Sequence, residues 1–314
     1  MKIIKYLFAF LIIFPAAFFS CKNNPEEEII IFHAGSLSVP LKQIATEYME
    51  QNPGIDIKME GAGSVACARK ITELAKPCDI FASADYKVIE QFLIPEYTDW
   101  NIWFATNEMV IAYHEKSAFS DRINSENWFN ILADEDVIYG RADPDADPCG
   151  YRTLMMFKLA EQYYGEEGLS DILAGKDMNM IRPKGVDLVA LLETKALDYI
   201  IEYKSVCEQH NLSYISLPDE VNLSDPGLDE LYKSVSVSIT GDNPGDIIQI
   251  PGSSMIYGVT LLNNAPNEKY AVDFLRFFLN DRSKEILRRN GQSPVSLYLS
   301  GPAENIPEGI KELF

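Results

Sequence analysis

The sequence predicts an α/β protein built around an open, largely parallel sheet. The first reason is that the order strand, small-residue turn, helix occurs three times in succession between residues 29 and 92. The second is that a further run of alternating strands and helices follows an extended segment at residues 103–113. The roughly 285 residues after the N-terminal segment are enough for two domains.

The three repeated units are defined by strands rich in β-branched and aromatic residues. These strands are expected at residues 29–32, 55–59 and 79–82, and the helices at residues 39–50, 65–74 and 86–92. Between them lie turns of small residues, His33 to Ser36, Gly61 to Ser64, and Ser83 to Asp85. Because the carboxyl ends of parallel strands lie at one edge of a sheet, we expect the three turns to meet there.

The rest of the chain repeats the alternation and then returns to the first lobe. Strands are expected at residues 137–139, 178–182, 197–202, 214–217 and 255–262, and helices at 126–132, 148–163, 186–193, 204–210, 267–279 and 281–290. Residues 218–229 have the composition of a loop. The predicted division is a first lobe of residues 29–111 plus 256–314 and a second lobe of residues 112–255.

The N-terminus has the features of a secretory signal peptide. Lys2 and Lys5 precede a short apolar run, and Ser20-Cys21 ends it before a polar, acidic stretch. We expect residues 1–20 to be removed, Cys21 to be lipidated, and residues 21–28 to form a tether that holds the protein at the membrane. The alternative is an ordinary signal peptide in which Cys21 occurs by chance. No other segment is apolar enough to span a bilayer.

Net charge and cysteine content limit the function further. The formal net charge of −20 argues against nucleic acid as a partner. Exposed charges are screened beyond about 8 Å, so binding of a small anion would depend on local donors. Of five cysteines, Cys67, Cys78, Cys149 and Cys207 remain besides Cys21. They allow three disulfide pairings or four free thiols, and none has the spacing of metal ligands.

The three turns form a candidate anion site. Helix N-termini have unpartnered amide groups and a partial positive charge. Gly35 and Gly63 allow close approach of the backbone, and Ser36, Ser64 and Ser83 add hydroxyl donors. Any one of these serines is equally explained as an ordinary helix cap. Together they predict a site for a dianion that requires no Lys or Arg.

Six motifs give the chain a family resemblance. They are FHAGSL (32–37), GAGSVACARKITEL (61–74), DIFASADY (79–86), DPCGYR (147–152), MIRPK (180–184) and EYKSV (202–206). In this order and spacing the chain resembles the tungstate/molybdate-binding proteins of archaeal type. The resemblance implies a type II periplasmic-binding-protein fold, in which two α/β lobes enclose a ligand cleft. It implies a non-enzymatic component of an ABC importer, without a cofactor, that delivers its oxyanion to the permease.

The resemblance also assigns ligand-binding residues. Gly35, Ser36 and Ser64 would contact the oxyanion from the first lobe, and Tyr203 would contribute its hydroxyl group from the second. Asp147, Pro148 and Cys149 would contact it largely through their backbone, apart from the Asp147 carboxylate.

In this family protein carboxylates bind the metal centre itself, and Asp147 matches one of them. The second carboxylate of the family falls on Gly185 in this chain. Three outcomes are open: Asp147 alone binds the metal; water, Asp187 or Glu202 supplies the further ligand; or the anion stays tetrahedral. The last outcome would weaken discrimination against sulfate.

Three other functions compete with tungstate or molybdate transport. A sulfate-binding or similar oxyanion-binding protein would have the same fold. A sensor of oxyanion would suit the same fold and anchor. A hydrolase with Ser36 or Ser64 as nucleophile and His33 as base would need an acidic partner for His33, and the chain lacks a G-x-S-x-G motif. We expect a monomer.

Overall fold

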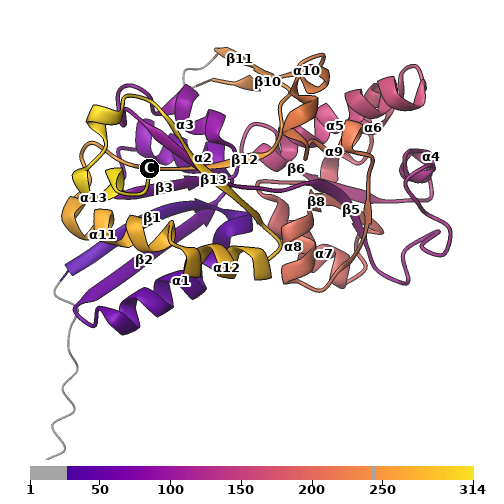
Figure 1. Ribbon diagram of the computed structural model, residues 1–314. Helices are drawn as coiled ribbons and strands as arrows, with labels where there is room; N and C mark the ends of the chain where they lie inside the picture. Colours follow the sequence, from indigo (N-terminus) through magenta and orange to yellow (C-terminus); the bar gives the residue numbers. More distant parts are fainter. Residues whose placement is uncertain (1–26, 242–244) are drawn as a thin grey trace, which may run out of the picture.

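The computed structural model describes residues 27–241 and 245–314. The predicted signal peptide, Cys21 and most of the tether lie outside this range. Among the described residues, no helix is both long enough and apolar enough to cross a membrane. The chain forms two α/β lobes side by side (Figure 1), which confirms the predicted fold class.

The first lobe contains a six-stranded sheet in the order β13-β4-β12-β3-β1-β2. β1 is parallel to β2 and β3, whereas β12 is antiparallel to β3 and β4. The strands are β1 (Glu27–Ala34), β2 (Ile55–Ala62), β3 (Ile80–Ser83), β4 (Asn101–Thr106), β12 (Ile256–Leu261) and β13 (Ser293–Ser300). The three predicted βα units therefore form the parallel part of this sheet, and β13 was not predicted.

Six α-helices and two 3-10 helices accompany this sheet. They are η1 (Gly35–Leu37), α1 (Ser38–Gln51), α2 (Ser64–Thr72), α3 (Tyr86–Phe92), α11 (Glu268–Phe278), α12 (Asp281–Arg289), η5 (Ala303–Asn305) and α13 (Glu308–Lys311). The amphipathic pattern predicted for α11 is confirmed, since Ala271, Phe274, Leu275 and Phe278 are all buried. Gly291 follows α12 with a φ of +79°, as a glycine after a helix commonly does.

The second lobe contains a five-stranded sheet in the order β7-β6-β8-β5-β9. Its strands are β5 (Met109–Tyr113), β6 (Tyr139–Ala142), β7 (Ile181–Arg182), β8 (Tyr199–Tyr203) and β9 (Ser213–Ser216). Its longer helices are α4 (Trp128–Ala133), α5 (Pro148–Tyr164), α6 (Leu169–Gly175), α7 (Val189–Glu193) and α8 (Lys204–Gln209). The short elements are η2 (Met178–Met180), η3 (Gly185–Leu188), α9 (Asp219–Asn222), η4 (Pro226–Leu228) and α10 (Asp229–Tyr232).

The long helix α5 begins where its sequence predicts. Asp147 caps it by accepting a hydrogen bond from the amide of Cys149, and Pro148 occupies the first turn, where no amide hydrogen is needed. The helix ends at Gly165 in the left-handed conformation. Asp147 is thereby held at a helix N-terminus that faces the other lobe.

The two crossings between the lobes lie at residues 107–108 and 252–255. β5 belongs entirely to the second sheet, so the chain leaves the first sheet before residue 111, where the first lobe is expected to end. The segment predicted as one extended connection is in fact two strands, β4 and β5, in different sheets. β12, which begins at Ile256, lies within the strand expected at residues 255–262.

A β-hairpin that the sequence analysis missed joins the lobes at the top of Figure 1. It consists of β10 (Ser236–Thr240) and β11 (Ile247–Pro251). Arg69 of the first lobe donates hydrogen bonds to the carbonyl oxygens of Thr240 and, at 2.9 Å, of Asp145 in the second lobe. The stretch 218–229, expected to be a loop, contains α9 and η4.

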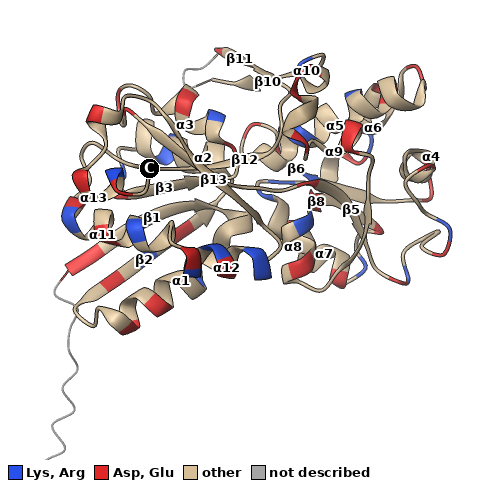
Figure 2. Ribbon diagram, in the orientation of Figure 1, with Lys and Arg blue, Asp and Glu red and all other residues tan. Residues whose placement is uncertain are grey.

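The structure shows how the charged residues are distributed and that the described cysteines are free. Acidic residues are spread over both lobes with Lys and Arg between them (Figure 2). Cys67, Cys78, Cys149 and Cys207 are all buried free thiols, so of the two possibilities the structure shows the one without disulfides.

Candidate functional site

The lobes meet where the first two predicted turns face the N-terminus of α5 and η3. A Cβ atom at Gly63 would lie 2.1 Å from the carbonyl oxygen of Ala146, and one at Gly35 would lie 3.1 Å from the side chain of Val186. The amide of Ala66 donates a hydrogen bond of 3.1 Å to Ala146. The lobes therefore touch, and Gly63 is the residue whose lack of a side chain allows this contact.

Ser36 contributes a buried hydroxyl group from η1. Its Oγ lies 2.9 Å from the hydroxyl oxygen of Tyr257. Its carbonyl oxygen accepts hydrogen bonds from the side-chain amides of Gln209, at 3.2 Å, and Gln292, at 2.9 Å. The turn is thus held by residues of α8 and of the segment after α12.

Ser64 and Ser83 are both completely buried but differ in their hydrogen bonds. Ser64 Oγ accepts a 3.0 Å hydrogen bond from the amide of Ala84, which leaves its own hydrogen free to donate. Ser83 Oγ donates to the carbonyl oxygen of Asp85 at 2.6 Å and accepts from the amide of the same residue. Ser64 is therefore the better donor to an anion, since Ser83 already uses its hydrogen.

The N-terminus of α5 presents a carboxylate rather than free amides. Asp147 Oδ1 accepts the Cys149 amide at 3.0 Å, and Oδ2 accepts the Gly185 amide at 3.1 Å. Pro148 has no amide hydrogen, so it has no backbone donor for an anion. Both carboxylate oxygens of Asp147 thus bond to backbone amides of its own lobe, at the beginning of α5 and of η3.

A second carboxylate, that of Glu202, lies against Gly185. A Cβ atom at Gly185 would lie 1.9 Å from Glu202 Oε2, so this glycine leaves room for the carboxylate. Glu202 Oε1 accepts the amide of Tyr203 at 2.7 Å, and the Cys149 thiol lies 3.5 Å away. Glu202 Oε2 is buried and has no hydrogen-bond partner among the described residues. The carboxylates of Asp147 and Glu202 thus converge on Gly185, where the sequence predicted a missing carboxylate.

Burial determines the protonation of both carboxylates. Desolvation raises the pKa of Asp147 to about 6, although the amides of Cys149 and Gly185 oppose it. Desolvation and, to a smaller extent, the charge of Asp147 raise the pKa of Glu202 to about 8, although the amide of Tyr203 opposes the increase. Near neutral pH Asp147 is mostly ionised and Glu202 mostly protonated. A pair with separated pKa values in a buried site is typical of a functional position.

Arg152 is the buried cation next to these groups. Its Nη1 donates to the carbonyl oxygen of Ala84 at 2.9 Å and contacts the Tyr203 hydroxyl at 3.4 Å, and its Nη2 lies 2.8 Å from Asp85 Oδ2. Tyr151 donates a 2.7 Å hydrogen bond to the same Asp85 oxygen. Although burial alone would lower it, the pKa of Arg152 is raised by Asp85, so the guanidinium stays charged. Arg152 therefore links the first lobe to Tyr203.

Three further residues considered in the sequence analysis, His33, Cys149 and Asp187, have the surroundings of structural residues. Burial lowers the pKa of His33, whose Nδ1 lies 2.9 Å from the carbonyl oxygen of Ala34. Burial also raises the pKa of the Cys149 thiol well above its ordinary value. Asp187 is partly exposed and lies 3.5 Å from Lys184. None of the three has the environment of a nucleophile, a base or a buried ligand.

The sequence analysis missed four residues that connect the site. Asp85, Tyr151, Asn107 and Tyr257 are all buried and hydrogen-bonded to residues of the site or its neighbours. Asp85 is visible in the sequence only as a helix cap, which it also is, since Oδ1 accepts the Lys87 amide at 2.9 Å. Its partners in α5 come from a distant segment, and no local pattern identifies them.

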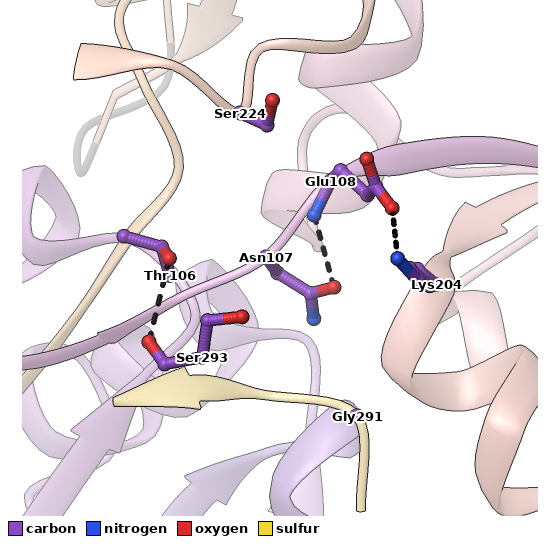
Figure 3. Close-up of a pocket in the computed structure, with 7 residues that line it drawn as sticks. All are labelled: Thr106, Asn107, Glu108, Lys204, Ser224, Gly291 and Ser293. Atoms are coloured by element: carbon purple, nitrogen blue, oxygen red, sulfur yellow. Dashed lines mark hydrogen bonds and ion pairs between the residues drawn. The ribbon is translucent and has the colours of Figure 1, made fainter. Parts of the chain in front are cut away.

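A polar cavity of about 270 Å³ lies at the crossing between the lobes. Figure 3 shows its lining, in which Asn107 and Glu108 form the crossing segment and Lys204 pairs with Glu108 at 2.6 Å. Thr106 donates a 3.4 Å hydrogen bond to the carbonyl oxygen of Ser293. Asn107 therefore lies at the hinge and also bonds to Tyr257, next to Ser36.

Comparison with solved structures supports the same architecture. The molybdate-binding protein of Azotobacter vinelandii matches with a TM-score of 0.60 and 14% identity over 84% of this chain and 98% of its own. The sulfate-binding protein SubI of Mycobacterium tuberculosis matches with a TM-score of 0.61 and 10% identity over 86% of this chain and 87% of its own. At such low identity these likenesses show the two-lobed periplasmic-binding-protein fold.

Sequence relatives are much closer. The "Molybdate/tungstate-binding protein WtpA" of Pyrococcus abyssi is 45% identical over 315 residues, covering 91% of this chain and 89% of that protein. The protein of the same name from Thermococcus kodakarensis is 42% identical, covering 93% and 89%. An "Uncharacterized solute-binding protein" of Petrotoga mobilis is 45% identical, covering 98% and 94%.

The family model described as "Bacterial extracellular solute-binding protein" matches residues 29–292. The match covers the second lobe, the first lobe up to the end of α12, and every residue of the site. Its members bind solutes outside the cytoplasm and are not enzymes. This chain is a member of the bacterial extracellular solute-binding protein family.

Proposed function

We propose that this protein captures tungstate or molybdate and delivers it to the permease of an ABC importer. The observation that carries the proposal is the convergence of two buried carboxylates, those of Asp147 and Glu202, on Gly185. Buried carboxylates repel a dianion unless they are protonated or bind its central atom. A tungsten or molybdenum centre accepts additional oxygen ligands, whereas the sulfur of sulfate does not.

The remaining groups suit the oxygen atoms of the anion. Ser36 and Ser64 have buried hydroxyls at the edge where the lobes meet, and the Tyr203 hydroxyl lies beside Arg152. The helix N-termini behind them add partial positive charge. In this assignment Glu202 takes the position that the family resemblance gave to residue 185, and Gly185 supplies its amide to Asp147. The names of the relatives from Pyrococcus abyssi and Thermococcus kodakarensis support the same ligands.

We also propose that the mature protein is a monomer anchored through lipidated Cys21. Lobe closure would carry the signal to the permease, because bound anion stabilises the closed arrangement through contacts to both lobes.

The test is calorimetric titration of the purified protein with tungstate, molybdate and sulfate. Glu202→Gln and Asp147→Asn keep the size of each side chain but remove its ability to bind a metal centre as a carboxylate. We expect wild type to bind tungstate and molybdate far more tightly than sulfate, and both variants to lose this preference. Glu230→Gln, at an exposed position, serves as the control. Sulfate binding as tight as tungstate binding in wild type would refute the proposal.

A further inference from the structure

The hydroxyl group of Ser36 belongs to a chain of hydrogen bonds that begins at the hinge. Ser36 Oγ lies 2.9 Å from the Tyr257 hydroxyl oxygen, and either oxygen is close enough to donate. The Tyr257 hydroxyl also receives a 2.8 Å hydrogen bond from Asn107 Nδ2. Asn107 lies in the first crossing segment, directly after β4. Tyr257 lies in β12, directly after the second crossing. The question is which of these groups donates to which.

The orientation of the Asn107 side chain is fixed by backbone amides. Its Oδ1 accepts hydrogen bonds from the amides of Glu108, at 3.0 Å, and Ser205, at 3.3 Å; Figure 3 shows the first of these. An amide nitrogen could not accept either bond, so Nδ2 must face the other way. There it donates to Ser205 Oγ at 2.6 Å and to the Tyr257 hydroxyl.

This orientation determines the direction of the remaining bond. Because Nδ2 of Asn107 can only donate, the Tyr257 oxygen accepts from it. Burial raises the pKa of Tyr257 to about 12, so its hydroxyl keeps its single hydrogen. Ser36 Oγ, 2.9 Å away, is within hydrogen-bond distance of the Tyr257 oxygen, and Ser205 also interacts with this hydroxyl. We assign Ser36 Oγ as the acceptor of the Tyr257 hydrogen. The hydrogen of Ser36 is then left for another partner.

We propose that Asn107 and Tyr257 are positioning residues that make the Ser36 hydroxyl a hydrogen-bond donor to the bound oxyanion. The inference rests on the proposed function, in which Ser36 contacts the anion. A fully deprotonated oxyanion has only acceptors, so a serine that is already oriented as a donor binds it without first reorienting. The series of hydrogen bonds starts at Asn107 in the crossing segment. The orientation of the Ser36 hydroxyl is therefore determined by a residue at the hinge.

The first experiment is a double-mutant cycle for tungstate affinity with Tyr257→Phe and Ser36→Ala. Tyr257→Phe removes one hydroxyl group and should weaken binding by about tenfold, the usual range for a hydrogen bond to a charged group. In the Ser36→Ala background the same change should have no effect, because Tyr257 acts only through Ser36. Tyr232→Phe is the matched control, since Tyr232 is also fully buried and its hydroxyl donates to a backbone carbonyl elsewhere in the second lobe.

Asn107→Asp provides a second test with almost no change in shape. A carboxylate only accepts, so Tyr257 would donate to residue 107 and Ser36 would donate to Tyr257, turning its hydrogen away from the anion. The added negative charge weakens binding as well, but that effect also occurs in the Ser36→Ala background. We therefore expect the loss of affinity to be larger when Ser36 is present than when it is replaced.

The outcomes separate this inference from the proposed function. Equal losses with and without the Ser36 hydroxyl, for Tyr257→Phe or for Asn107→Asp, would mean a merely structural role and would overturn the inference. If Tyr257→Phe does not fold, the Asn107→Asp cycle decides. A wild-type protein that binds neither tungstate nor molybdate would overturn the proposed function itself, and the inference with it.

Discussion

Arg152 of the second lobe and Asp85 of the first form an ion pair, with Nη2 and Oδ2 2.8 Å apart and both side chains almost completely buried. Arg152 also contacts Tyr203, the residue expected to donate to the anion from the second lobe. The Arg152 side chain therefore contacts both the opposite lobe and a residue of the site.

Replacing Asp85 with Asn is predicted to weaken anion binding by disfavouring closure. Removing one partner of a buried ion pair costs about 3–5 kcal/mol. The lobes avoid this cost by separating, so we expect a loss of tungstate affinity of at least about tenfold and a larger radius of gyration by small-angle X-ray scattering. Glu230→Gln breaks an exposed pair with Lys233 and should change neither measurement. Unchanged affinity in Asp85→Asn would exclude a role of the pair in closure.

Replacing Gly185 with Ala is predicted to abolish the preference for tungstate. The new Cβ atom would lie 1.9 Å from Glu202 Oε2, so the carboxylate must move away. We expect Gly185→Ala to resemble Glu202→Gln in calorimetric titration. Gly185→Glu should not improve binding either, because its side chain would occupy the space of Glu202. Gly175→Ala is the control, as nothing lies within 4 Å of its Cβ position. Tight, selective binding by Gly185→Ala would show that Glu202 is not a ligand.

The stability of the anion-free protein is predicted to fall as the pH rises through the range in which Glu202 titrates. Its pKa is about 8 in the folded protein against an ordinary value of 4.5. A raised carboxyl pKa means that the folded state binds more protons than the unfolded state, so stability declines between these two pH values. Glu202→Gln removes this cost, and we expect it to unfold at a higher temperature than wild type at pH 8. A variant that is no more stable than wild type at this pH would contradict the prediction.

The pH dependence of binding distinguishes coordination of the metal from hydrogen bonding. Coordination requires the ionised carboxylate, so Glu202 must release its proton and tungstate affinity should rise with pH up to about 8. Calorimetry in buffers of different ionisation enthalpy would measure the released proton directly at pH 7. If Glu202 instead donated its proton to an anion oxygen, no proton would be released and affinity would fall above pH 8.

Ser64 and Ser83 are predicted to contribute unequally to the affinity for the anion. Ser64 has a free hydroxyl hydrogen, whereas Ser83 donates its hydrogen to the carbonyl of Asp85. Ser64→Ala should therefore weaken tungstate binding by about tenfold. Ser83→Ala should change the stability of the turn more than the affinity, as measured by thermal unfolding and titration. A larger loss of affinity in Ser83→Ala would reverse this assignment.

Much of the first lobe could be predicted because its signals are local. The alternation of β-branched strands with small-residue turns predicts β1, β2 and β3 and the helices that follow them, and α3 has the expected bounds. The hairpin β10–β11 and strand β13 were missed because their own composition does not indicate strands. They are strands because they pair with each other or with β4. The crossing at Asn107 was missed because β4 and β5, two successive strands in different sheets, have the residue pattern of a single extended segment.

The sequence by itself determined the α/β class, the return strand at Ile256 and the capped start of α5 at Asp147, because periodicity, turn residues and helix caps act over a few neighbouring residues. It also determined the family, through motifs that keep their order and spacing. Only the tertiary structure decided that Glu202 lies against Gly185 and that Arg152 reaches Asp85. Each of these pairs joins segments whose approach depends on how whole strands and helices pack, and no local pattern contains that information.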